Sequence, residues 1–211
     1  MKKDAEKIVE KLFLKYPNAR CELDFSTPFE LLVAVILSAQ CTDKRVNIVT
    51  QTLFKTHNKP EHFANIDQAE LEQKIHACGF YRNKAKNIIA CAKCIVEKHS
   101  GAVPSTVEEL TELAGVGKKT ANVVYAVGFG GQAIAVDTHV FRVANRIGIA
   151  NAPTPEKTEE QLMRALPERL WTKSHHALLF HGRYTCRARK PDCADCPVSE
   201  DCDYFQSGKA E

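Results

Sequence analysis

The sequence predicts an all-α protein, and three observations lead to this prediction. Apolar residues recur at helical spacing from the start of the chain, as at Ile8, Leu12 and Tyr16. Helix-starting signals, a serine or threonine followed by proline or by glutamate three places on, recur along the chain. No segment shows a convincing alternation of apolar and polar residues, which is the pattern of a half-buried strand. We therefore expect about nine or ten helices with short connections.

Capping residues place individual helices. Residues 27–30 (Thr-Pro-Phe-Glu) combine an N-cap, a first-turn proline and a capping-box glutamate. The helix that follows, ELLVAVILSAQ, is apolar on nearly all sides, so we expect it to be central and buried. Residues 105–108 (Ser-Thr-Val-Glu) predict a second capping box, and Thr154 before Pro155 begins a later helix.

Composition restricts the class of protein. The chain has 211 residues, 44% of them hydrophobic and 26% charged, which suffices for one large or two small domains with a core. The net charge of +3 excludes a tail that coats nucleic acid indiscriminately, so any basic surface must be local. The N-terminus lacks the apolar region of a signal peptide, and the longest apolar run, residues 31–37, is too short to span a bilayer. We therefore expect a cytoplasmic protein with no targeting signal and no membrane association.

Four of the nine cysteines lie close together near the C-terminus. Four thiolates in one short loop can surround a tetrahedral zinc ion or a cubane iron–sulfur cluster, and ligand type alone does not separate the two. The first gap of six residues is long for a zinc ribbon. Cys91 and Cys94 form another close pair, but they lie in a helical stretch where packing is the expected role. The four C-terminal residues are Cys186, Cys193, Cys196 and Cys202.

A basic run surrounds the first of these four cysteines. The segment HGRYTCRARK contains no acidic residue. Such a run is compatible with a solvated face or with contacts to phosphate groups. Its basic residues are Arg183, Arg187, Arg189 and Lys190.

The stretch LAGVGKKTAN, residues 113–122, joins two predicted helices through a glycine turn. The turn consists of Gly115, Val116 and Gly117, and a helix is expected over residues 118–128. Backbone N–H groups at the start of that helix, together with its dipole, favour an anion such as a DNA phosphate. Lys118 and Lys119 add positive charge. Taken alone, the stretch is also compatible with an ordinary glycine turn, and it lacks the spacing of a P-loop.

Asp137 stands directly before another helix with a clear apolar period. Such a residue is a good N-cap, and a carboxylate at a helix start can be both a cap and a catalytic group. Lys119 and Asp137, 18 residues apart, could meet across a helical hairpin.

Taken together, these motifs resemble the endonuclease III family of helix-hairpin-helix DNA glycosylases. The resemblance is carried by LAGVGKKTANVV, VDTHVFRVANR and the C-x6-C-x2-C-x5-C tail, and LLVAVILSAQCTD and GFYRNKAKNI also match. It extends from about Leu23 to Cys202. It implies two helical domains with a DNA-binding cleft between them. Residues 22–132 would form a six-helix domain ending in the helix-hairpin-helix (about 108–127), and residues 1–21 plus 133–211 a discontinuous domain with the cluster loop.

The resemblance also implies a chemistry and a partner. The partner would be double-stranded DNA with an oxidised pyrimidine or an abasic site, bound by a monomer that associates with the nucleoid. Lys119 would attack the sugar of a flipped-out nucleotide, displace the base and form a Schiff base that permits β-elimination. Asp137 would stabilise positive charge on the sugar and assist proton transfer. The four C-terminal cysteines would hold a 4Fe–4S cluster.

Three further residues match family positions. Gln40 matches the residue that fills the gap left by the flipped base, and Asp43 could cap the next helix and shape the pocket. Phe80 matches the wedge between helices, where the family commonly has leucine. Ala114 is a second departure, because the common motif has proline before the first glycine.

Three alternatives remain open from the sequence. A monofunctional glycosylase for adenine opposite oxidised guanine usually lacks the lysine at position 119 and carries an added C-terminal domain. A thymine- or uracil-mismatch glycosylase typically has tyrosine at that position. A non-catalytic zinc- or cluster-bearing DNA-binding module would not need Lys119 together with Asp137.

Overall fold

A computed structural model describes residues 3–208 of the chain, and within that range it is all-helical, which confirms the predicted fold class. The described residues form twelve α-helices and three 3-10 helices, more than the nine or ten α-helices expected. Two of them, α4 (Pro60–Ala64) and α12 (Asp203–Gln206), have only five and four residues, which is too short for an apolar period to reveal. No helix among the described residues is both long and apolar enough to cross a membrane.

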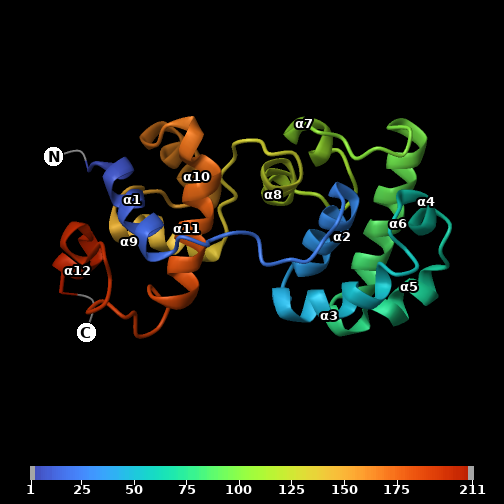
Figure 1. The fold of residues 1–211 in the computed structure, drawn as a ribbon, viewed down its shortest axis with the longest axis horizontal. Helices are drawn as coiled ribbons and strands as arrows, with labels where there is room; N and C mark the ends of the chain where they lie inside the picture. The colour runs from blue at the N-terminus through green and yellow to red at the C-terminus, as the bar shows by residue number, and fades with distance from the viewer. Residues whose placement is uncertain (1–2, 209–211) are drawn as a thin grey trace. The chain divides into compact units, whose positions relative to one another are not determined.

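The chain divides into two compact units (Figure 1). Residues 22–130 form one, which we call the inserted unit, and residues 1–21 with 131–211 form the other, which we call the terminal unit. Besides α4, the inserted unit contains α2 (Pro28–Ser38), α3 (Asp43–Leu53), α5 (Gln68–Ile75), η1 (His76–Cys78), α6 (Tyr81–Lys98), α7 (Val107–Thr111) and α8 (Lys118–Gly128). Besides α12, the terminal unit contains α1 (Ala5–Lys15), α9 (Thr138–Ile147), α10 (Pro155–Ala165), η2 (Glu168–Leu170), α11 (Trp171–Tyr184) and η3 (Ser199–Asp201).

Helix α2 forms the centre of the inserted unit, where it contacts α3, α6 and α8 (Figure 1). All of its residues from Phe29 to Leu37 are buried, as its uniformly apolar sequence predicts. The predicted N-cap is confirmed, since Thr27 Oγ1 accepts from the backbone N–H of Glu30 at 3.2 Å. The Glu30 carboxylate accepts at 2.6 Å from the N–H of Ser26, the residue before the cap, where a capping box has the N–H of the cap itself.

The second predicted cap lies one residue later in the structure. Thr106, not Ser105, is the N-cap of α7, and its Oγ1 accepts from the N–H of Glu109 at 3.2 Å. Ser105 with Glu108 and Thr106 with Glu109 both place a hydroxyl residue three positions before a glutamate. The pattern therefore fits two adjacent registers, and packing of the helix selects one of them.

In the terminal unit, α11 packs against α9 and α1, and α10 and α12 also contact α9 (Figure 1). Their buried faces form one core, to which α1 contributes Ile8 and Leu12. The close approach of α9 and α11 depends on Gly182, because a Cβ atom there would lie 2.8 Å from Cβ of His139. This contact fixes the helix that begins at Asp137 against the helix that leads to Cys186.

Candidate functional site

The glycine turn between α7 and α8 has the conformation that its first glycine requires. Gly115 has φ of +77°, and a Cβ atom there would lie 2.8 Å from Cβ of Asn87 on α6. Both facts strongly disfavour any other residue at this position. Val116 differs from the expectation that all three turn residues offer their amides. Its side chain is buried and its N–H donates to the carbonyl of Leu113 at 3.1 Å, so that amide serves the turn itself.

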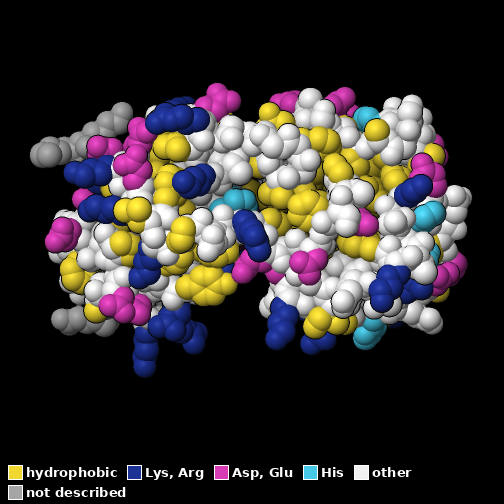
Figure 2. Space-filling model, in the orientation of Figure 1, with side chains coloured by type: hydrophobic (Ala, Val, Ile, Leu, Met, Phe, Trp, Pro, Cys, Tyr) yellow, Lys and Arg dark blue, Asp and Glu magenta, His cyan; other side chains and the backbone are white. Residues whose placement is uncertain are grey.

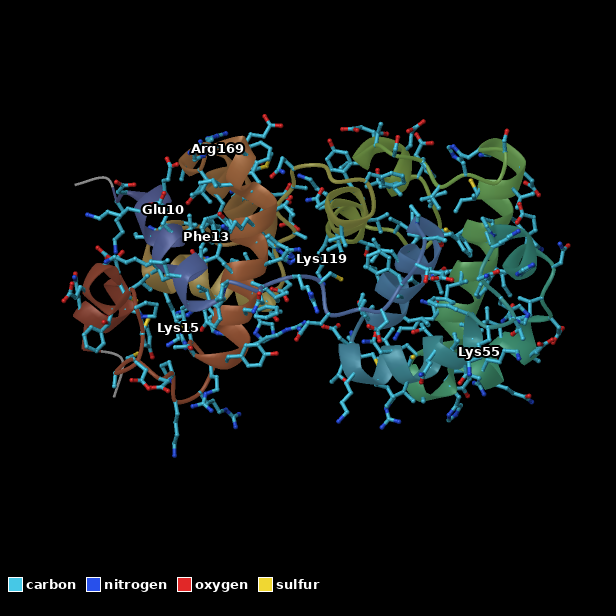
Figure 3. The ribbon with its side chains drawn as sticks, in the orientation of Figure 1. Glu10, Phe13, Lys15, Lys55, Lys119 and Arg169 are labelled. Atoms are coloured by element: carbon cyan, nitrogen blue, oxygen red, sulfur yellow. The ribbon has the colours of Figure 1, made fainter. Side chains whose placement is uncertain are left out.

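Gly117 is the N-cap of α8, the helix expected over residues 118–128. It has no side chain to accept from the first-turn amides, and a Cβ atom at this position would meet nothing within 4 Å. The helix start is therefore open to an external acceptor. Lys118 and Lys119 occupy the first turn of α8, and both are exposed. Figure 3 labels Lys119, whose side chain extends from this end of the helix.

Gln40 and Phe80 share an unusual backbone conformation. Both have positive φ, +53° and +46° respectively, which is uncommon for residues other than glycine. Both are also exposed, and 67% of the Phe80 surface is accessible to solvent. Gln40 follows the end of α2, and Phe80 is the N-cap of α6, so each stands at a junction between helices of the inserted unit.

Asp43 does not cap the helix that follows Gln40, contrary to one part of its expected role. Thr42 is the N-cap of α3, and its Oγ1 accepts from the N–H of Arg45 at 3.3 Å. Asp43 is the first residue of that helix and is half-buried. A threonine hydroxyl one residue earlier satisfies the same helix start, which leaves the Asp43 carboxylate for other contacts.

Asp137 is the N-cap of α9, as the sequence predicts. Its Oδ1 accepts from the N–H of His139 at 2.9 Å and from that of Val140 at 2.8 Å. Both bonds go to the same oxygen, and the side chain is half-buried. The two amides and the helix dipole hold the carboxylate in one orientation.

The four C-terminal cysteines line one pocket of the terminal unit, together with residues that include His181 and Tyr204. Burial raises the pKa of Cys196 to about 11 and also raises that of Cys193, and the neighbouring cysteines raise both further. Thiols this close together cannot all ionise unless a positive group compensates them, as a bound metal does. In residues 3–208, no group of three or more His, Cys, Asp or Glu side chains is arranged to hold a single metal ion.

Two arginines on α9 hold the start of the cysteine loop, and the sequence reading did not single them out. Arg146 donates to the carbonyls of Arg187 at 2.8 Å and Ala188 at 3.0 Å. Arg142 donates to the carbonyls of Gly182 at 2.8 Å and Cys186 at 3.1 Å. Their i, i+4 spacing on the helix that Asp137 begins was the available signal, because it puts both on one face.

The basic run lies on the same loop. Arg187, Arg189 and Lys190 are exposed, whereas Arg183 is half-buried near the end of α11. Figure 2 shows Lys and Arg side chains projecting from the edge of the terminal unit along which this loop runs. The carbonyl contacts of Arg146 stabilise the loop backbone and leave the charges of the run in solvent.

The candidate residues thus fall into two groups. The inserted unit carries Gln40, Asp43, Phe80 and the turn with its two lysines, whereas the terminal unit carries Asp137, the basic run and the cysteines.

The inserted unit contains a further polar residue, Lys84, that the sequence analysis did not single out. Lys84 is only 6% exposed, and its ammonium donates to the carbonyls of Leu37 and Cys78, each at 2.8 Å. A lysine at an otherwise apolar position of α6 was the only signal for it.

Comparison with known proteins shows the family to which the chain belongs. Residues 33–168 match the family model of the HhH-GPD superfamily of base excision DNA repair proteins. Endonuclease III of Bacillus subtilis (strain 168) is 50% identical over 201 residues, which cover 95% of this chain and 92% of that protein. Endonuclease III of Escherichia coli (strain K12) is 44% identical over 197 residues, 93% of each chain.

A solved structure provides an independent comparison. A trapped covalent intermediate of endonuclease III with DNA is 42% identical and superposes with a TM-score of 0.94 over 99% of both chains. The family model covers more than half of this chain, and the relatives cover nearly all of it. The chain therefore belongs to the endonuclease III family of base excision DNA repair enzymes, which are DNA glycosylases with AP lyase activity.

Proposed function

We propose that this chain removes oxidised pyrimidines from duplex DNA and nicks the resulting abasic site through a Schiff base on Lys119. The observation that carries this proposal is the position of Lys119, exposed in the first turn of α8 directly after a helix start that is open to a phosphate. A relative 42% identical to this chain has been trapped as a covalent intermediate with DNA, which supports a covalent mechanism here.

The turn before α8 binds the DNA backbone. The first-turn amides of α8 and the positive end of its dipole meet a phosphate, and Gly117 leaves room for its close approach. The positive charge of Lys118 attracts the phosphate backbone whatever the DNA sequence, and salt screens this attraction. The exposed Arg187, Arg189 and Lys190, with Arg183, act on a further part of the backbone.

Gln40 and Phe80 act on the base stack. Phe80 presents an exposed aromatic ring that enters a base step and unstacks it, and Gln40 fills the space of the extruded nucleotide. Unstacking a base costs a few kcal/mol. This cost is smallest for a damaged or mispaired base, so a lesion is extruded more readily than an intact base pair. The half-buried Asp43, three residues after Gln40, helps to shape the pocket for the extruded base.

The chemical step begins when Nζ of Lys119 forms a bond to C1′ of the sugar and the bond to the base breaks. Asp137 stabilises the positive charge that develops on the sugar and assists the proton transfers. Nζ then loses a proton and the bond from C1′ to O4′ breaks, with a proton taken up by O4′, which opens the sugar ring and leaves an iminium. The iminium loses a proton from C2′, and the bond from C3′ to the phosphate oxygen breaks, which nicks the strand. Hydrolysis of the imine regenerates the free lysine.

The donor set in the terminal unit suits a 4Fe–4S cluster. Cys186, Cys193, Cys196 and Cys202 would hold it, because all four thiols line the same pocket. When bound, the cluster compensates the four thiolates and makes the loop with the basic run rigid. We further propose that the chain acts as a monomer in the cytoplasm, where its substrate is the DNA of the nucleoid.

Borohydride trapping tests the mechanism. The protein is incubated with duplex DNA containing an abasic site, and borohydride is then added to reduce any imine to a stable adduct. We expect an adduct with the wild-type protein and with Lys118→Ala, and none with Lys119→Ala. No adduct with the wild-type protein, or an unchanged yield from Lys119→Ala, would refute the proposed nucleophile.

A further inference from the structure

Three non-glycine residues of the inserted unit, Gln40, Phe80 and Ser100, have positive φ, and the first two are candidate site residues. Gln40 lies in the junction that follows α2, and Phe80 lies in the junction that joins η1 to α6. Such conformations persist only where the surrounding structure enforces them, and they cluster at functional positions. Both side chains are exposed, so their own packing does not enforce these conformations.

Lys84 links the two junctions. Its ammonium donates to the carbonyl of Leu37, three residues before Gln40, and to the carbonyl of Cys78, two residues before Phe80. Its backbone N–H donates to the carbonyl of Phe80 itself at 3.1 Å. One residue therefore contacts both junctions, although Leu37 and Lys84 are 47 positions apart in the chain.

The chemistry of these contacts explains why a lysine is buried here. Leu37 lies in the last turn of α2 and Cys78 ends η1, so both carbonyls belong to helix ends that lack intrahelical donors. An ammonium satisfies them and complements the negative end of the α2 dipole. None of the ion pairs of the described residues includes Lys84, so the carbonyls take the place of a counterion.

Two thiol groups also act on the ammonium. Burial lowers the pKa of Lys84, and Cys41 and Cys78 partly offset this shift. Cys78 also shares a hydrogen bond with Cys41, the residue after Gln40. The two junctions thus meet at one polar cluster, in which Cys78 and Lys84 are buried and Cys41 is half-buried.

We propose that Lys84 is a positioning residue that fixes the backbone of both junctions and so sets Gln40 and Phe80 in the orientations from which they enter the DNA stack. The DNA part of this inference rests on the proposed function of those two side chains, whereas the coupling of the junctions does not. Lys84 acts through the two junctions and has no direct role in the chemistry at Lys119.

Hydrogen exchange tests the coupling without DNA. Lys84→Met keeps the length of the side chain and removes the donors, and Lys93→Met makes the same change at an exposed position of α6. We expect amides of residues 38–42 and 76–81 to exchange about tenfold faster in Lys84→Met, as the loss of a charged hydrogen bond implies, and at the wild-type rate in Lys93→Met. If only one junction changes, or neither does, the coupling is refuted. Should Lys84→Met fail to fold, Lys84→Gln serves the same comparison with a smaller expected effect.

Base excision tests the consequence. We expect Lys84→Met to excise an oxidised pyrimidine from duplex DNA about tenfold more slowly, and to form the borohydride adduct on a single-stranded abasic oligonucleotide at the wild-type rate. A merely structural role would slow both reactions together. In a Gln40→Ala/Phe80→Ala background, adding Lys84→Met should slow excision little further, because the side chains that it positions are absent.

The outcomes separate the two proposals. Additive losses in the triple variant would overturn the positioning role of Lys84. Wild-type protein that neither excises nor traps would refute the proposed function, and hydrogen exchange would still decide whether Lys84 couples the junctions.

Discussion

Oδ1 of Asp137 accepts a hydrogen bond of 2.8 Å from the backbone N–H of Val140, in the first turn of α9. The same oxygen accepts from His139, so the carboxylate proposed for catalysis is also the cap of a helix in the core of the terminal unit. A substitution at this position therefore affects two properties, and the choice of replacement can separate them.

The two roles of Asp137 predict different results for two substitutions. Asn retains a capping oxygen but lacks the charge, so Asp137→Asn should lose excision and keep its thermal stability. Asp137→Ala should lose excision and about 1 kcal/mol of unfolding free energy as well. Denaturant unfolding and single-turnover excision measure both effects. Equal stability of the two variants would show that the cap contributes nothing, and an active Asp137→Asn would exclude the catalytic role of the charge.

The two glycines of the turn before α8 should respond in opposite ways to alanine. Gly115→Ala puts a side chain at positive φ and against Asn87, which should cost about 2 kcal/mol or more of stability. Gly117 has φ of −85° and open space around it, so Gly117→Ala should fold normally. Its methyl group should instead obstruct the phosphate and weaken DNA binding about tenfold, as for one lost charged hydrogen bond. Unaltered DNA affinity of Gly117→Ala would count against a phosphate at this helix start.

The purified protein should be brown and contain iron and acid-labile sulfide in cluster stoichiometry. Cys196→Ser removes a proposed ligand, so the variant should contain neither iron nor sulfide. The terminal unit should also be less stable, because the cluster no longer holds the cysteine loop together. Cys94→Ser is the matched control, since Cys94 lies on α6 of the inserted unit and should not affect metal content. Stoichiometric zinc without iron would contradict the cluster assignment.

His176 predicts a loss of stability in mild acid. Burial lowers its pKa to about 4 from the ordinary 6.5, and Nδ1 has no hydrogen-bond partner among the described residues. The unfolded chain binds the proton more readily, so the contribution is complete above pH 6.5 and is lost as the pH falls toward 4. The free energy of unfolding should fall by about 3 kcal/mol over this pH range because of His176. Urea unfolding of the wild-type protein and His176→Leu across this range should give a flatter pH dependence for the variant, and identical slopes would disprove the assignment.

Features that depend on neighbours in sequence could be predicted from the sequence. The caps at Thr27 and Asp137 and the burial of α2 follow from residue types a few positions apart, and the structure has them as expected. The register of α7 was predicted one residue early because two adjacent registers satisfy the same pattern. The cysteine spacing predicts a metal centre for the same local reason, since its ligands lie within one loop.

Contacts between distant parts of the chain were decided only by tertiary structure. Arg146 reaches the carbonyl of Arg187, 41 positions away, and Lys84 reaches Leu37 across 47 positions. The local pattern indicates that Arg146 shares a helix face with Arg142 and that Lys84 lies on an apolar face, but it does not identify the acceptors, because every residue of the chain carries a backbone carbonyl. A local pattern determines which backbone groups a helix leaves unpaired, whereas packing between helices determines which side chain satisfies them.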